Sequence, residues 1–188
     1  MLQWTGLRPS AEHHDVGQKR WWLGTQPESH EIAAHTGIGL MVPLSKISNP
    51  EVRGLADEAV RFLETHSWCG RVRSGELAFA VAGVVGVFKI AFEPARSDVD
   101  SVLWIITGDL PPAYLVTDDA PDWQSALAAY IDEMRTWVAA VRNGSPTADV
   151  IPVSVAPTVE HAQILESRLD FLQREFVAVS ADSIEGDV

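Results

Sequence analysis

The fold is decided by one stretch of the chain, from Glu76 to Gly144, which reads ELAFAVAGVVGVFKIAFEPARSDVDSVLWIITGDLPPAYLVTDDAPDWQSALAAYIDEMRTWVAAVRNG. Apolar residues recur first at every second position and later at every third or fourth position. Side chains alternate across a strand, whereas they return to one helix face after three or four residues. The change of period therefore predicts several strands followed by a long helix.

The first half of this stretch predicts an antiparallel meander of three to four strands. Residues 102–106 are apolar at successive positions, which is typical of a central strand covered on both faces. Pro111-Pro112 ends that strand because proline cannot donate a ladder hydrogen bond. We expect strands around residues 77–81, 88–92, 102–106 and 113–117.

Outside the meander, helical periods predict three helices. The first begins at Pro50, a residue suited to the first helical turn, and fades near His66. The long helix opens after the aspartates of residues 118–122 and ends at Asn143-Gly144, and a last helix begins at Thr158. Residues 150–155 are either an edge strand or an extended crossing.

These elements predict an α+β fold: an N-terminal helix, the meander, and then two amphipathic helices packed on one face. Residues 1–48 lack a sustained period, so we expect an irregular N-terminal arm. Residues 49–179 are expected to form a single α+β domain, and residues 180–188 a flexible tail.

The charge and the cysteine content exclude several kinds of protein. Asp and Glu outnumber Lys and Arg 26 to 14, giving a net charge of −12. Such a surface repels phosphate backbones, so we expect no nucleic-acid partner and favour a protein partner with a basic surface. The single cysteine excludes an intramolecular disulfide, and the longest apolar run is too short to span a bilayer. We therefore expect a cytoplasmic protein without membrane contact.

Two sets of residues are candidates for enzymatic chemistry. Cys69 follows His66 by three residues, which is close enough in a turn for a thiolate–imidazolium pair, although no third residue is identified to orient the histidine. His30 and His35 resemble a zinc-binding pair, but they lie five apart, and a helix places both ligands on one face only at a spacing of four. The sequence contains no phosphate loop and no nucleophile elbow. We therefore predict no catalytic residue, no metal and no cofactor.

The loops flanking the last two strands are rich in aspartate. Carboxylates gathered there would form either a cation site or an acidic patch for protein contact, although aspartate is also a favoured turn and cap residue. The predicted binding residues are Asp98, Asp100, Asp109, Asp118 and Asp119.

Residues 67–176 resemble an uncharacterised family of small acidic bacterial cytosolic proteins, a domain of unknown function. The segments that carry the resemblance are Val84–Glu93, Val102–Leu115, Tyr130–Met134, Ile151–Val153 and Leu165–Leu169. No activity is established for that family, so no site residue is carried over from it. Small acidic proteins of this build are similar in style to toxin-immunity proteins.

The sequence thus favours a non-enzymatic protein-interaction module of the immunity or inhibitor type. The alternative is an enzyme of unrecognised type, using either Cys69 with His66 or a histidine-based metal site.

Overall fold

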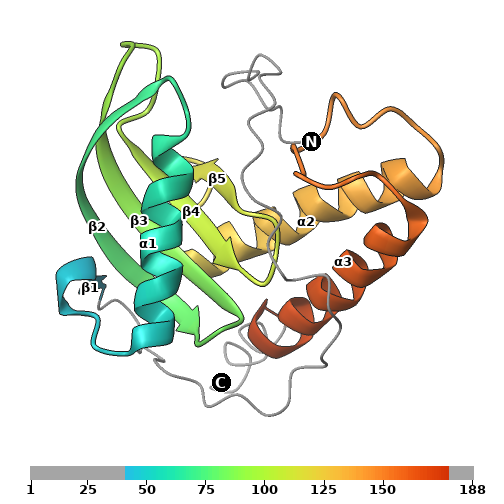
Figure 1. The fold of residues 1–188 in the computed structure, drawn as a ribbon, viewed down its shortest axis with the longest axis horizontal. Coiled ribbons are helices and arrows are strands. Elements are labelled where there is room, and N and C mark those ends of the chain that lie inside the picture. Colours follow the sequence, from blue (N-terminus) through green and yellow to red (C-terminus); the bar gives the residue numbers. More distant parts are fainter. Residues whose placement is uncertain (1–40, 178–188) are drawn as a thin grey trace, which may run out of the picture.

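The computed structural model describes residues 41–177, which form an α+β fold (Figure 1). Within this range lie one five-stranded antiparallel sheet and three α-helices. The strands are β1 (Val42–Pro43), β2 (Cys69–Val81), β3 (Val85–Pro94), β4 (Val102–Gly108) and β5 (Ala113–Val116). The helices are α1 (Pro50–Glu64), α2 (Trp123–Arg142) and α3 (Val159–Leu172), with a 3-10 turn at Leu44–Lys46 and a π-helical turn at Gln173–Val177.

The strands lie side by side in chain order, β1-β2-β3-β4-β5, and each neighbouring pair is antiparallel. A tight turn joins β2 to β3, and Gly83 adopts a φ of 70° there, a conformation that costs glycine little. In β4, Trp104 faces Lys89 of β3 on one side and Leu115 of β5 on the other.

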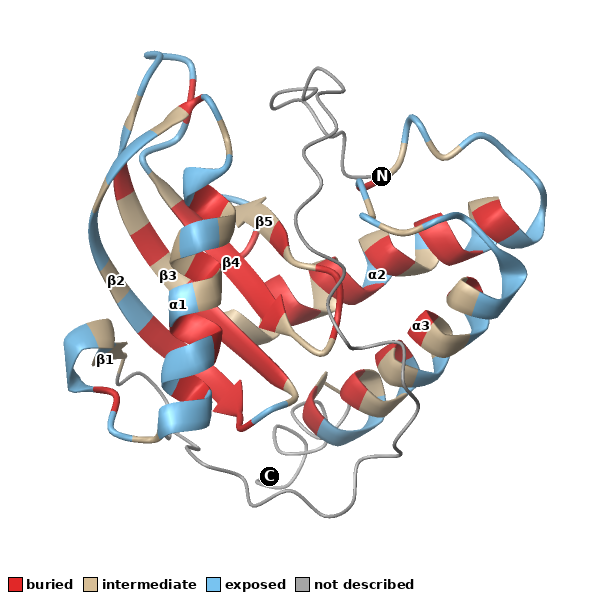
Figure 2. Cartoon of the chain, viewed as in Figure 1, coloured by how far each residue is buried: buried red, intermediate tan, exposed pale blue. Residues whose placement is uncertain are grey.

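The sheet is the middle layer between helices (Figures 1 and 2). Leu103 and Ile105 of β4 belong to a buried cluster with α1, whereas Trp104 and Ile106 belong to a second cluster with α2 and α3. Successive strand residues point to opposite faces, so a strand with helices on both sides is apolar at almost every position. The expectation of a two-sided core around β4 is confirmed.

Each α-helix begins at a residue whose side chain satisfies free backbone N–H groups. Asn49 accepts hydrogen bonds from the N–H groups of Glu51 and Val52, and Thr158 accepts one from His161. Asp122 and Ser125 form a reciprocal capping box at the start of α2. Local sequence therefore sets where these helices start.

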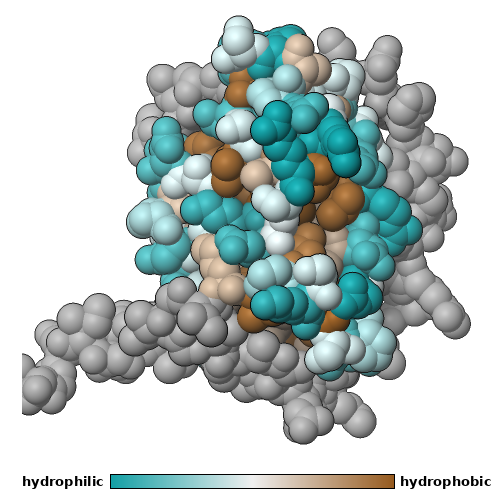
Figure 3. Space-filling view, turned by 90° about the vertical axis from the view of Figure 1, so that its left-hand side faces the viewer, coloured by the Kyte–Doolittle hydropathy of each residue, from teal (hydrophilic) through white to brown (hydrophobic). Residues whose placement is uncertain are grey.

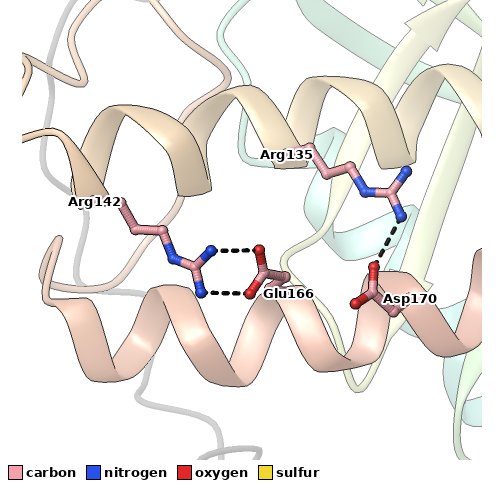
Figure 4. A network of polar contacts seen from close by, with 4 residues as sticks. All are labelled: Arg135, Arg142, Glu166 and Asp170. Atoms are coloured by element: carbon pink, nitrogen blue, oxygen red, sulfur yellow. Dashed lines mark hydrogen bonds and ion pairs between the residues drawn. The ribbon is translucent and has the colours of Figure 1, made fainter.

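Two ion pairs join α2 to α3 (Figure 4). Arg142 donates two hydrogen bonds to the Glu166 carboxylate, at 2.7 and 2.5 Å, and Arg135 donates one to Asp170 at 2.9 Å. The order of these partners along the chain shows that the two helices run antiparallel. Exposed pairs of this kind stabilise by about 0–1 kcal/mol each, so they fix the alignment of helices that the core holds together.

The predicted element order was wrong. The first helix does not open the fold, because β1 precedes α1, and the sheet has five strands rather than three or four. β1 is two residues long, and its pairing with Glu76 and Leu77 of β2 depends on tertiary contact rather than on a local pattern. The described residues exclude 1–40 and 178–188. Most of the expected N-terminal arm (1–48) and all of the expected tail (180–188) therefore lie outside them.

β2 also begins earlier than we expected. Its first half contains exposed residues such as Arg71, Arg73 and Ser74, and this half pairs with β3 alone. A strand segment exposed in this way has no apolar alternation for a sequence pattern to detect. Residues 150–155 are not a strand, which leaves the extended crossing.

Among residues 41–177, no helix combines the length and apolar character needed to cross a membrane.

Candidate functional site

The sheet topology sorts the predicted binding residues between the two ends of β4. Because β4 and β5 are antiparallel, the residues before β4 and those after β5 meet at one end, together with the start of β2. We call this the acidic end and define it by Asp98, Asp100, Asp118 and Asp119. Asp109 follows β4 at the other end, about 20 Å away for a seven-residue strand.

Asp109 is tied into the fold. Arg168 of α3 contacts both the carboxylate and the backbone carbonyl of Asp109. Two residues further on, the carbonyl of Pro111 accepts a hydrogen bond of 2.8 Å from the buried hydroxyl of Tyr130. The β4–β5 connection is thus anchored to α2 and α3, and Asp109 serves to anchor it.

Asp98 is exposed but already paired. Its carboxylate accepts two hydrogen bonds from Arg96, from Nε at 3.0 Å and from Nη2 at 2.5 Å. The hydrogen bond from Arg96 lowers the pKa of Asp98. A partner would have to compete with Arg96 for this carboxylate.

The other three aspartates of the acidic end form no ion pair with any part of the chain that the structure describes. These three, Asp100, Asp118 and Asp119, are exposed. Their loops are nevertheless held in place. The indole Nε1 of Trp104 donates a 2.7 Å hydrogen bond to the carbonyl of Ala120, and Val99 is buried against the α1 side of the sheet.

His66 and Cys69 lie beside the acidic end but do not form a reactive pair. Within the described residues, no hydrogen bond joins the thiol to the imidazole. The Cys69 thiol donates to the carbonyl of Gly70 at 3.4 Å, and Nδ1 of His66 donates to the carbonyl of Phe62 at 3.0 Å. Their backbones are joined by a bond of 2.9 Å from Cys69 N to His66 O.

The titration of both groups opposes nucleophilic chemistry. Burial raises the pKa of the Cys69 thiol to about 11, with a smaller contribution from the charge of Glu64. Burial lowers the pKa of His66, against the opposing effect of its hydrogen bond to Phe62. At neutral pH the pair is therefore a thiol beside a neutral imidazole, whereas a nucleophilic cysteine needs the thiolate.

An aromatic cluster that no sequence pattern predicted lies at this end. The His66 ring lies between Phe62 and Tyr114, with ring centroids 5.0 and 5.3 Å away, and both contacts are edge-on. Trp68 contacts His66 at 4.8 Å and Tyr114 at 5.1 Å. These rings come from the end of α1, the following turn and β5. No single segment displays the cluster, which is why only tertiary structure reveals it.

The outer edge of β2 is a weaker candidate. Arg71 and Arg73 are exposed there, and Arg73 pairs with Glu93 at 3.0 Å. The register shifts twice between Cys69 and Ser74, and bulges and charged residues on an edge strand hinder the addition of another strand. Figure 3 shows this side of the molecule, where small apolar groups alternate with hydrophilic side chains outside the grey residues.

The described residues offer no cluster of metal ligands. Within residues 41–177, no group of three or more His, Cys, Asp or Glu side chains is placed to hold a metal ion. The histidines of the alternative metal hypothesis, His30 and His35, lie outside the described residues.

Searches against protein-family models, curated proteins and solved structures found no match for this chain. The resemblance to an uncharacterised family therefore stays a prediction from the sequence.

Proposed function

We propose that this protein is a non-enzymatic protein-interaction module whose acidic end binds a basic surface of a protein partner, as an inhibitor or immunity protein does. One observation carries the proposal: Asp100, Asp118 and Asp119 are exposed at the same end of the sheet without an ion pair among the described residues. Elsewhere, several exposed or half-exposed carboxylates are matched by arginines of the chain itself: Glu93, Glu166 and Asp170.

Unpaired surface charge supports recognition more than folding. Like charges that follow one another, as in Asp118-Asp119, repel and add nothing to the stability of the monomer. A basic partner relieves that repulsion, and complementary charge accelerates its association at low ionic strength. We place the interaction in the cytoplasm, because a chain with one cysteine makes no use of disulfide stabilisation.

The test compares two double variants with the same change in charge. Asp118→Asn/Asp119→Asn neutralises the acidic end, and Asp57→Asn/Asp132→Asn neutralises exposed aspartates on α1 and α2. Each protein is used at low salt to capture partners from a lysate of the source cell, and the captured proteins are identified by mass spectrometry. We expect the wild type and the α1/α2 variant to retain a basic protein that the acidic-end variant loses.

Salt provides the second readout. Binding through exposed charges weakens as ionic strength rises, because the Debye length shortens from about 10 Å at 0.1 M to about 3 Å at 1 M. Recovery of the same proteins by all three forms, or retention unaffected by 1 M salt, would contradict the proposal.

A further inference from the structure

β5 is an edge strand of the sheet. Within residues 41–177 it pairs with β4 alone, and no described strand lies on its other side. Unlike the first half of β2, β5 contains no charged residue, and its pairing with β4 shows no register shift. Charged residues and bulges protect an edge strand from further pairing. β5 lacks both of these protections over its four residues.

The register of the sheet shows which backbone groups of β5 point outward. In an antiparallel sheet, successive residues bond alternately to one neighbouring strand and to the other. The bond of 2.9 Å from Phe92 N to Ser101 O continues the β3–β4 register, so odd-numbered residues of β4 bond to β3 and even-numbered ones to β5. Leu115 lies opposite Trp104, so its backbone groups face β4. The N–H and C=O of the next residue, Val116, therefore point away from β4.

These outward groups of Val116 are available for pairing. Within the described residues, no turn, loop or side chain forms a hydrogen bond with the Val116 backbone. The side chains of Leu115 and Val116 are only half-buried, one on each face of the sheet. A neighbouring strand would cover both with its own side chains, and such cross-strand pairs stabilise a sheet. The edge thus offers a backbone donor, a backbone acceptor and uncovered apolar surface.

Two aspartates follow this edge directly. Asp118 and Asp119 come two and three residues after Val116, so the chain itself keeps their backbones within about 11 Å of it. All neighbouring strands of the sheet are antiparallel, and antiparallel pairing is slightly more stable per residue than parallel pairing. An antiparallel strand added to β5 enters at the end where β5 ceases. The residues that precede its paired segment then lie beside the two aspartates, where basic side chains are complementary in charge.

We infer that β5 binds an extended segment of a protein partner as an added antiparallel strand, with basic residues that precede this segment lying beside Asp118 and Asp119. The inference rests on the proposed function, since it names the form in which the basic partner binds the acidic end. Backbone hydrogen bonds to the edge of β5 hold the segment, and the charges set its direction.

The test uses the full chain and two peptides of the same composition and charge. Acetyl-Lys-Lys-Thr-Val-Thr-Val-Thr-amide has its basic pair before the extended segment, and acetyl-Thr-Val-Thr-Val-Thr-Lys-Lys-amide has it after. Each peptide is titrated into the ¹⁵N-labelled protein, and affinities are taken from the shift of the Val116 amide. We expect the first peptide to bind about two- to fivefold more tightly, because it places both cations beside the aspartates.

Amide hydrogen exchange gives a readout that needs no variant. In the free protein, the N–H of Val116 points away from β4, so we expect it to exchange faster than the N–H of Leu115, which the β4–β5 ladder protects. The first peptide should slow exchange at Val116 and leave Leu115 unchanged. Equal protection of the two amides in the free protein would overturn the inference.

Methylated peptides and a pair of variants test the hydrogen bonds themselves. N-methylation of alternate peptide residues blocks one edge of the peptide at a time. We expect one set of methyl groups to weaken binding at least about fivefold and the other set to have little effect. Val116→Pro removes the outward N–H and should weaken binding to a similar degree, whereas Val116→Thr keeps this N–H and should bind as the wild type does.

The outcomes distinguish this inference from the function on which it rests. If both peptides and both methylated sets bind equally and Asp118→Asn/Asp119→Asn weakens all of them, the added strand is overturned and the acidic interaction surface stands. If that double variant changes no affinity, both proposals fail. Binding of neither peptide overturns the inference alone, because capture from the lysate tests the function separately. Self-association of the free protein that Val116→Pro abolishes in sedimentation velocity would assign the edge to a second copy of the chain and overturn the inference.

Discussion

The two ends of β4 show how one sheet separates structure from recognition. At the end that follows Gly108, Asp109 binds Arg168, and the carbonyl of Pro111 accepts from Tyr130. At the acidic end, Asp100, Asp118 and Asp119 form no ion pair among residues 41–177, and within the same range the indole N–H of Trp68 finds no acceptor. Both ends contain aspartates and aromatic residues. The difference is that α2 and α3 supply partners to the first end only.

The difference between the two ends of β4 also explains why the number of aspartates in the loops did not predict which of them lie together. Five aspartates in neighbouring loops look equivalent in the sequence. An odd number of strand crossings between two loops places them at opposite ends of a sheet, so Asp109 is separated from the other four. The same residue type anchors a loop at one end and presents charge at the other.

Removing the Tyr130 hydroxyl should have the largest effect of four changes. Tyr130→Phe leaves the buried carbonyl of Pro111 without its donor, and an unsatisfied buried group costs about 1–3 kcal/mol. Urea unfolding measures the loss of free energy of unfolding. At the acidic end, Tyr114→Phe should cost less, because the Tyr114 side chain is only partly buried, whereas Tyr130 is fully buried. If Tyr130→Phe and Tyr114→Phe lowered the free energy of unfolding equally, the proposed difference between the two ends of β4 would be wrong.

Replacing Arg168 should have the next largest effect. Arg168→Met removes the partner of a carboxylate that is only 39% exposed in its side chain, and we expect a loss of about 1–2 kcal/mol after allowing for screening by solvent. Arg96→Met is the matched change at the acidic end, where both partners are exposed, and it should leave the midpoint of thermal unfolding unchanged. If Arg96→Met lowered the midpoint of thermal unfolding more than Arg168→Met did, the ion pair at the acidic end would be the one that stabilises the fold, contrary to our expectation.

The imidazole of His66 should give the acidic end a pH dependence of its own. Burial lowers the pKa of folded His66 below its unfolded value of about 6.5. The unfolded chain then binds the proton more readily, so the contribution of His66 to stability is complete above pH 6.5 and is lost as the pH falls toward the folded pKa. Free energies of unfolding measured between pH 7.5 and 5.5 should fall more steeply for the wild type than for His66→Gln, whereas parallel curves would contradict this cause.

The smallest effect on stability is expected from the unpaired aspartates. Asp118→Asn/Asp119→Asn removes exposed charges that make no ion pair within the described residues, so the free energy of unfolding should change by about 0.5 kcal/mol or less. Chemical denaturation of the double variant beside the wild type checks this. A loss above about 1 kcal/mol would show that Asp118 and Asp119 stabilise the fold. That result would argue against a role of these two residues in recognition.

Much of the fold followed from local patterns. The apolar stripe of α2 and the apolar run of β4 are longer than the apolar patterns of turns or exposed segments. Both belong to elements with many buried residues. The first half of β2 and all of β1 escaped detection, because an exposed edge and a two-residue strand leave no period to find. For the site, the sequence supplied the aspartates but could not say which of them meet.

The sequence by itself determined the α+β class, the helix caps and the large excess of acidic residues, because each depends on neighbouring residues or on composition alone. Only the tertiary structure decided that Asp109 is bound by Arg168, that four other aspartates share one end, and that rings from α1 and β5 meet there. These contacts join segments tens of residues apart, and their positions follow from the pairing of strands rather than from any local preference.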